Sequence, residues 1–211
     1  MGARVFVTTS HALWAGTLGD KILRPVTETG DSAVSTLADS LRLWMVTAGK
    51  ILQSENAGET WHAESVNIAL EARDPEVHPE VLPEVHWIRE VQLPAAQSGT
   101  STASAPASTL LLAGTTKGLY RRRGANAAWQ LVQNGLPAGE PISCFFGDGV
   151  WVVAMQIGGL YVSRDASQTW ERFDTGSVMG QFTGTAVTAD GNIVAASLTE
   201  GLLRYPLAKA D

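Results

Sequence analysis

The chain has 211 residues, of which 45% are hydrophobic and 17% are charged, and it contains 21 glycines and 7 tryptophans. This composition is typical of a globular, turn-rich protein of one ordinary domain or two small ones, and it excludes a disordered chain. A formal net charge of −6 argues against a nucleic-acid-binding or anionic-membrane-binding surface, because both need a clustered positive field.

Short β-rich runs separated by Gly, Asp, Asn or Ser turns follow one another along the whole chain, without a helical period of useful length. The first unit reads as the strands "RVFVTTS", "ALWAGT" and "KILRPV", without a fourth strand. The predicted units cover approximately residues 3–28, 33–66, 67–133 with an insertion at 72–108, 141–175 and 183–207.

A repeat sets the spacing of these units. The segment "VTAGKILQSENAGETW" (46–61) aligns with "GTTKGLYRRRGANAAW" (114–129), "MQIGGLYVSRDASQTW" (155–170) and "ASLTEGLLRYPL" (196–207). The later copies follow one another at a period near 42 residues, which is the length of one propeller blade of four short antiparallel strands. The sequence therefore predicts an all-β propeller of about five blades in a single domain. A closed ring and an open part of a larger ring both fit, and we expect the closed ring.

Two octapeptides within the repeat, "SENAGETW" (54–61) and "SRDASQTW" (163–170), share their polar and tryptophan positions. They resemble the Asp-box, or bacterial neuraminidase repeat, found in sialidases, sortilin-type receptors, some xyloglucan-cleaving enzymes and photosystem II assembly-factor propellers. The matching residues are Ser54, Asn56, Gly58, Thr60 and Trp61 in the first copy, and Ser163, Asp165, Thr169 and Trp170 in the second, where Ser167 replaces the glycine.

We interpret the octapeptide as a structural element that closes the turn between the third and fourth strands of a blade. Asn56 or Asp165 can accept backbone hydrogen bonds within its own turn, Gly58 can adopt a positive φ, and the tryptophan can cover the hairpin. Ser167 is expected to adopt another geometry or to be strained. The resemblance implies that the box lies on the rim, so a calcium or sugar site there is not favoured.

Ligand sites in propellers are expected where connections gather on one face near the central channel. In this chain that face includes the turns between the second and third strands. Their polar tips are Asp20, Thr47, Lys117, Gln156 and Glu200. These side chains could converge on one ligand, and the alternative is that they are ordinary solvated residues.

The segment "DPEVHPEVLPEVHW" (74–87) carries a proline at every fourth residue, which predicts an extended arm. His78 and His86 could share a zinc or nickel ion there. Without a third ligand at a motif spacing, an exposed loop is the favoured interpretation. No cofactor is expected. The lone Cys144 excludes an intramolecular disulfide and is predicted to be a buried apolar side chain.

Catalysis is not favoured. The resemblance to sialidases would imply an arginine triad, a tyrosine nucleophile and an F-R-I-P stretch, and that tetrapeptide does not occur. The carboxylate pair that could serve a glycosidase is Asp20 with Glu200, which would lie on adjacent turns if the ring closes.

We therefore expect a non-catalytic scaffold that binds a protein or small ligand, closer to the assembly-factor branch than to the sialidases. It would be a monomer, or a homodimer if the ring is incomplete. The alternative is a carbohydrate-active protein, either glycoside hydrolase-like or a lectin. Exposed aromatic residues on the ligand face would favour the sugar, and an apolar patch would favour a protein.

No signal peptide or membrane-spanning run is apparent, so a cytoplasmic location is expected unless the chain is trimmed from a longer protein.

Overall fold

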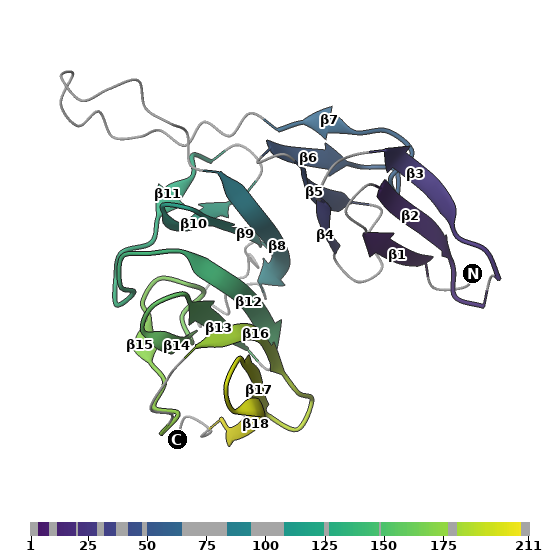
Figure 1. Ribbon diagram of the computed structural model, residues 1–211. Helices are drawn as coiled ribbons and strands as arrows, with labels where there is room; N and C mark the ends of the chain where they lie inside the picture. Colours follow the sequence, from purple (N-terminus) through teal and green to yellow (C-terminus); the bar gives the residue numbers. More distant parts are fainter. Residues whose placement is uncertain are drawn as a thin grey trace, which may run out of the picture.

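The computed structural model describes residues 4–8, 12–19, 21–28, 32–36, 42–47, 50–64, 84–93, 108–124, 127–147, 149–176 and 181–207. Over these residues the regular secondary structure consists of β-strands. The strands form five separate antiparallel sheets that follow one another along an open arc (Figure 1).

Each sheet keeps its strands in chain order, so that every strand pairs with the one before it and the one after it. Blade 1 contains β1 (Arg4–Thr8), β2 (Ala12–Thr17) and β3 (Arg24–Glu28); blade 2 contains β4 (Ser32–Thr36), β5 (Leu43–Thr47), β6 (Lys50–Ser54) and β7 (His62–Ala63). Blade 3 contains β8 (Val85–Leu93), β9 (Ser108–Thr115), β10 (Gly118–Arg123) and β11 (Gln130–Leu131). Blade 4 contains β12 (Pro141–Gly147), β13 (Val150–Met155), β14 (Gly159–Ser163) and β15 (Glu171–Arg172), and blade 5 contains β16 (Phe182–Val187), β17 (Asn192–Ser197) and β18 (Gly201–Pro206).

Consecutive blades pack face to face. Strands β4 and β5 contact β8, and β12 and β13 contact β16. This arrangement of small twisted antiparallel sheets around an axis is the β-propeller architecture, and it confirms the predicted all-β propeller fold.

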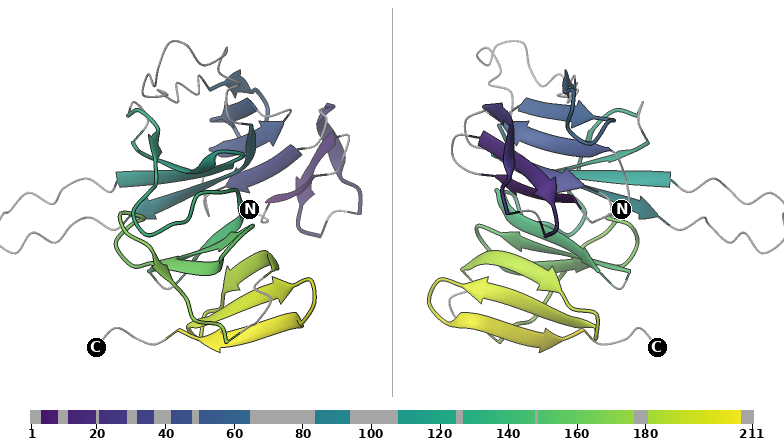
Figure 2. Two further views of the ribbon diagram at one scale, coloured as in Figure 1. Left: turned by 60° about the vertical axis from the view of Figure 1, so that its left-hand side comes forward. Right: turned by 90° about the vertical axis from the view of Figure 1, so that its right-hand side faces the viewer.

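The arc is open. Blades 1 and 5 stand apart at its two ends (Figures 1 and 2), so the expected closed ring is wrong for this structure and the partial propeller is the arrangement found. Each blade is rotated relative to its neighbour by an angle that the packed side chains set, and five such steps do not complete the circle.

The hydrophobic core consists of layers between neighbouring blades. Side chains alternate between the two faces of each strand, so each inner blade contributes one row to the layer before it and one to the layer after it. The layer between blades 2 and 3 includes Trp44 and Ile88, the layer between blades 3 and 4 includes Leu112 and Trp151, and the layer between blades 4 and 5 includes Val152.

A buried charge lies in the layer between blades 2 and 3. The guanidinium of Arg122, only 4% exposed, is placed over the rings of Trp44 and Trp129, at 5.6 Å and 5.0 Å from their centroids. It also forms an ion pair with Glu64. Cation–π attraction and the ion pair together offset the cost of removing this charge from water.

The octapeptide in blade 2 forms a compact hydrogen-bonded turn between β6 and β7. The Ser54 hydroxyl accepts a hydrogen bond from the Gly58 backbone N–H at 2.8 Å, and Oδ1 of Asn56 accepts one from the Thr60 N–H at 2.9 Å. Ala57 and Gly58 both have positive φ, at 57° and 87°.

The octapeptide in blade 4 repeats this geometry between β14 and β15. Ser163 Oγ accepts from the Ser167 N–H at 3.0 Å, and the Asp165 carboxylate accepts from the Thr169 N–H at 2.9 Å and from its hydroxyl at 2.6 Å. Ser167 keeps a φ of 63°, so the serine adopts the left-handed conformation in spite of its side chain, and Ala166 at 58° does the same.

The strand predicted over residues 21–26 is displaced, because β3 runs from Arg24 to Glu28. Its pairing with β2 is irregular between Leu13 and Trp14. Pro25 cannot donate a hydrogen bond to the sheet, which is tolerated here because β3 is the outer edge of its blade.

Candidate ligand-binding face

The turns between the second and third strands of the blades lie at equivalent positions, and we call the surface that they form the turn face. Lys117 is exposed in the β9–β10 turn, Gln156 is exposed in the β13–β14 turn, and Glu200 is exposed in the β17–β18 turn. Thr47 is the last residue of β5. Asp20 lies outside the described residues.

The turns that carry Lys117, Gln156 and Glu200 belong to the consecutive blades 3, 4 and 5. The possible pairing of Asp20 with Glu200 depended on contact between blades 1 and 5, and these two blades stand apart (Figure 1). Because Asp20 lies outside the described residues, the carboxylate pair stays a prediction.

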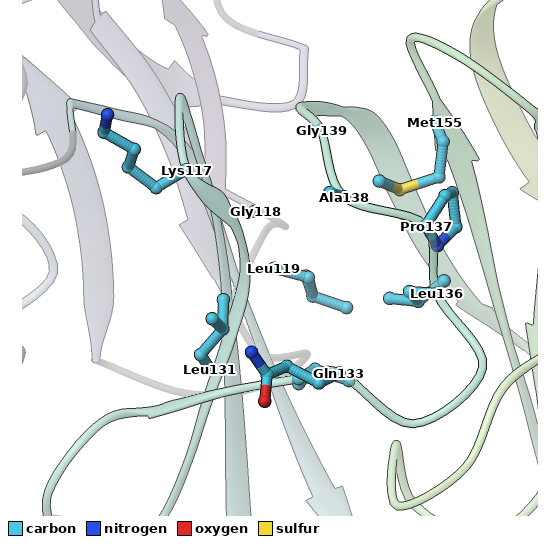
Figure 3. Close-up of a pocket in the computed structure, with 11 residues that line it drawn as sticks. Lys117, Gly118, Leu119, Leu131, Gln133, Leu136, Pro137, Ala138, Gly139 and Met155 are labelled. Atoms are coloured by element: carbon cyan, nitrogen blue, oxygen red, sulfur yellow. The ribbon is translucent and has the colours of Figure 1, made fainter. Parts of the chain in front are cut away.

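A pocket of about 220 Å³ opens on the turn face between blades 3 and 4. One wall is the start of β10 with the end of β11, the opposite wall is the connection from blade 3 to blade 4, and Met155 at the end of β13 completes it (Figure 3). Its lining side chains are mainly apolar, namely Leu119, Leu131, Val132, Leu136, Pro137, Ala138 and Met155. The polar side chains of the lining are Lys117 and Gln133.

Local hydrogen bonds hold the turn that presents Lys117. The Thr115 hydroxyl donates to the Gly118 carbonyl at 2.9 Å and accepts from the Lys117 backbone N–H at 3.1 Å. Thr115 is fully buried, so a buried, hydrogen-bonded side chain holds the turn that carries the exposed lysine.

The opposite wall is anchored to blade 4. The Asn134 carbonyl accepts from the Trp170 N–H at 3.0 Å, and the Glu140 carbonyl accepts from the Gln156 N–H at 2.9 Å. Gly135 between them has a φ of 85°, and a Cβ atom at this position would lie 1.7 Å from the Trp170 carbonyl oxygen. The wall of the pocket can therefore approach blade 4 this closely only with glycine at position 135.

The turn face also carries exposed aliphatic side chains. Leu18 and Ile22 in the β2–β3 connection are 72% and 77% exposed, Ile157 in the β13–β14 turn is 71% exposed, and Leu198 in the β17–β18 turn is 71% exposed. Scattered exposed leucines are ordinary on protein surfaces, but here they recur at the tips of equivalent turns in three blades.

Aromatic side chains are not exposed on this face. All 15 Trp, Tyr and Phe residues of the chain belong to the described part, and each is buried or half-buried. Sequence reasoning identified polar tips and missed the aliphatic ones, although an isolated Leu or Ile between Thr, Gly and Glu, as in "TLGD" and "SLTE", is a visible signal of an exposed apolar tip.

The described residues contain no group of three His, Cys, Asp or Glu side chains that could hold a metal ion. His86 Nδ1 lies 3.1 Å from Glu140 Oε1, while His78 lies outside the described residues. Cys144 is buried, and burial raises the pKa of its thiol. Within the same part of the chain, no helix is long and apolar enough to cross a membrane.

No family model matches the chain, and no curated protein matches its sequence. Solved structures do match. The extracellular domain of a putative hybrid two-component system from B. thetaiotaomicron aligns with 99% of this chain and 25% of its own at a TM-score of 0.64 and 11% identity. A GH74 xyloglucanase from Xanthomonas campestris aligns with 97% of this chain and 28% of its own, at a TM-score of 0.60 and 18% identity.

A third structure, YCF48 bound to D1 peptide, aligns with 96% of this chain and 67% of its own, at a TM-score of 0.55 and 14% identity. The chain thus spans about a quarter of the length of the first two proteins. At these identities the likeness establishes the β-propeller fold.

Proposed function

We propose that this chain is a non-catalytic Asp-box β-propeller that binds a protein segment through its turn face. The observation that carries the proposal is the apolar pocket between blades 3 and 4, together with the exposed Ile157 in the turn that follows Met155 of its lining. An apolar surface rimmed by polar residues favours a protein partner.

The octapeptide geometry supports the Asp-box assignment. In both copies the side chain at the third position accepts hydrogen bonds inside the turn, so Asn56 and Asp165 are used structurally. We therefore expect the turn face, and not the Asp-box, to contact the ligand.

The pocket is sized for one apolar side chain of a peptide. Leu119, Leu136 and Met155 would contact that side chain, and Lys117 or Gln133 at the pocket would hydrogen-bond to peptide carbonyl groups or ion-pair with a carboxylate. Ile157 follows the β13 wall by two residues and would extend the apolar contact. A propeller of similar fold, YCF48, has been solved with a bound peptide, which supports this kind of ligand.

The absence of exposed aromatic residues disfavours a carbohydrate ligand, since sugars are usually bound against exposed aromatic rings. The described part of the turn face offers aliphatic tips instead.

The experiment is selection of peptides from a random display library on the wild-type chain, followed by affinity measurement with variants. Ala138→Phe would place a ring in the pocket without touching the core, because Ala138 is exposed at its edge. We expect Ala138→Phe and Ile157→Asp each to weaken the selected peptide roughly tenfold or more, which is about 1.4 kcal/mol.

The matched control is Ala189→Phe, the same substitution at an exposed alanine in the β16–β17 turn, at the opposite end of the strands. It should not affect binding. Peptides that bind all variants equally would refute the proposal. In parallel, a thermal-shift screen with sialic acid and β-glucan oligomers tests the carbohydrate alternative. A saturable shift that is lost in Glu200→Ala would favour that alternative over ours.

A further inference from the structure

The lining of the pocket between blades 3 and 4 carries a single charged side chain. Of the described residues that form it, Lys117 is basic, none is acidic, and the others are apolar or neutral. Figure 3 shows Lys117 at one end of the pocket and Gln133 at the other, with Leu119 between them. The apolar walls therefore have a positive charge at one end and no negative charge among them.

The ammonium group of Lys117 forms none of the ion pairs found between described residues. Its side chain is exposed, whereas the backbone of its turn is fixed. Besides the hydrogen bonds to Thr115, the Thr116 N–H donates to the Glu84 carbonyl at 3.0 Å, and the Glu84 N–H donates to the Thr116 hydroxyl at 3.2 Å. The turn thus keeps the charge at the pocket while the side chain retains its reach.

The acidic residues beside the pocket lie outside its lining. Glu140 follows Gly139 of the pocket wall, and its carboxylate is paired with His86, whose Nδ1 lies 3.1 Å from Oε1. Glu84 is bonded to the turn of Lys117 through its backbone, and its side chain is exposed. An acidic group supplied by a ligand would therefore meet Lys117 without displacing an ion pair of the described residues.

We propose that the pocket binds a protein segment in which an aliphatic side chain, inserted between the apolar walls, is adjacent or next but one to an aspartate or glutamate that pairs with Lys117. This inference rests on the peptide site proposed above and names the sequence that the site selects. Removal of the aliphatic side chain from water supplies affinity. The ion pair supplies discrimination among apolar segments.

The carboxylate is that of an acidic side chain and not that of a chain terminus. Proteins capture a terminal carboxylate with clustered backbone N–H groups. In this turn the N–H of Lys117 already donates to the Thr115 hydroxyl, and that of Thr116 donates to the Glu84 carbonyl. The donor that the turn offers is the ammonium group, a point charge on a flexible stem, which can reach an acidic side chain at more than one position.

The overall charge of the protein makes this preference distinctive. With a formal net charge of −6, the chain as a whole repels acidic peptides and attracts basic ones. Non-specific electrostatics would therefore enrich lysine and arginine among selected peptides. Enrichment of aspartate and glutamate requires a local positive site.

The experiment begins with a display library in which one leucine is fixed and the neighbouring positions are randomised. On the wild type we expect aspartate or glutamate to be enriched next to the leucine or one position further away. The best sequence is then synthesised with an acetylated N-terminus and an amidated C-terminus, which removes the terminal carboxylate. Replacement of its acidic residue by the matching amide should weaken binding about threefold to fivefold, as for an exposed ion pair.

Variants of the protein locate the partner of this carboxylate. Lys117→Gln keeps the backbone N–H that holds the turn, and it should weaken the acidic peptide by the same factor while leaving the amide peptide unaffected. Raised salt should reduce the difference between the two peptides on the wild type. The matched control is Lys21→Gln, which removes an exposed lysine from the β2–β3 connection of blade 1. Blade 1 does not border the pocket, so this variant should bind both peptides as the wild type does.

The outcomes separate this proposal from the peptide site on which it rests. Peptides that lose binding to Ala138→Phe but show no acidic preference, or keep that preference in Lys117→Gln, would establish the site and overturn this inference. Equal effects of Lys117→Gln and Lys21→Gln would also overturn it, because they would show a response to overall charge. A peptide that binds only with a free C-terminus would assign the carboxylate to the chain end instead. Failure to select any peptide, or equal binding to Ala138→Phe, would overturn both proposals.

Discussion

The indole N–H of Trp170 donates a hydrogen bond to the hydroxyl of Ser167, 3.3 Å away, inside the turn of blade 4. In blade 2 the equivalent residues are Trp61 and Gly58, and the buried indole nitrogen of Trp61 has no hydrogen-bond partner. The serine is strained by its positive φ but satisfies a buried donor, whereas the glycine is relaxed and leaves the donor unsatisfied. The turn of blade 4 thus accepts backbone strain and satisfies the indole N–H, whereas the turn of blade 2 avoids the strain and leaves the indole N–H without a partner.

Substitution of Gly58 can separate the energetic cost of the positive φ from that of the unsatisfied indole N–H of Trp61. Gly58→Ala should destabilise the fold by about 1 to 2 kcal/mol, because alanine must adopt a φ of 87°. Gly58→Ser has the same strain, but its hydroxyl can accept from Trp61, so it should be about 1 kcal/mol more stable than Gly58→Ala. The space around position 58 permits ordinary contact for a Cβ atom. Urea denaturation of the two variants gives the comparison, and equal stabilities would contradict it.

The lowered pKa of the Asp165 carboxyl predicts that the folded protein loses stability at acid pH. Partial burial acts to raise the pKa of this carboxyl, but hydrogen bonds from Thr169, Ser163 and Gln168 outweigh it and lower the pKa from 3.8 to about 2. The unfolded chain therefore binds a proton at higher pH than the folded chain does. The stability that Asp165 contributes is complete above about pH 4 and is lost as the pH falls towards 2.

The matched variant is Asp165→Asn, because blade 2 already has Asn56 at this position. Between pH 5 and 2.5, melting temperatures of the wild type should fall more steeply than those of Asp165→Asn. The reverse change, Asn56→Asp, should make the fall steeper. Parallel curves for all three proteins would show that this carboxyl does not control acid stability.

Substitution of Gly135 tests how the wall of the pocket is anchored to blade 4. Gly135→Ala should cost about 3 kcal/mol or more, because its Cβ would overlap the Trp170 carbonyl oxygen and the backbone would have to move. Gly149→Ala is the control, since its φ of 76° is similar and no atom lies within 4 Å of the added Cβ. It should cost only the backbone strain of about 1 to 2 kcal/mol. Similar losses in both variants, measured by denaturation, would contradict the steric explanation.

The buried Arg122 should be replaceable by an apolar residue of similar length. Arg122→Met keeps a chain between Trp44 and Trp129 and loses the cation–π contacts, so it should cost about 1 kcal/mol. Arg122→Ala also creates a cavity and should cost about 3 kcal/mol. Arg123→Ala at the exposed neighbouring position should stay within about 0.5 kcal/mol of the wild type. Equal losses in Arg122→Met and Arg122→Ala would show that the charge, and not the packing of the side chain, stabilises this layer.

Much of the strand pattern could be read from the sequence. The predicted strand over 12–17 coincides with β2, because alternation between faces and short polar turns are local properties. The open shape could not be read in the same way. The repeat period determines the size of a blade, whereas the angle between blades depends on the side chains packed between them.

The residues of the pocket could also be predicted from the sequence only in part. Lys117 was identified because it stands at the tip of a predicted turn. Leu131, Leu136 and Pro137 were missed because the connection "QLVQNGLPAG" (130–139) has no period that would mark a surface. Its position follows from Gly135, whose role depends on a contact with Trp170, 35 residues further along the chain.

The layered core has a consequence for how the molecule unfolds. Blades 2, 3 and 4 are each supported on both faces, while blades 1 and 5 each rest on a single neighbour within the chain. A linear array with nearest-neighbour contacts loses structure from its ends before its middle. Amide hydrogens of β17 should therefore exchange faster than those of β13.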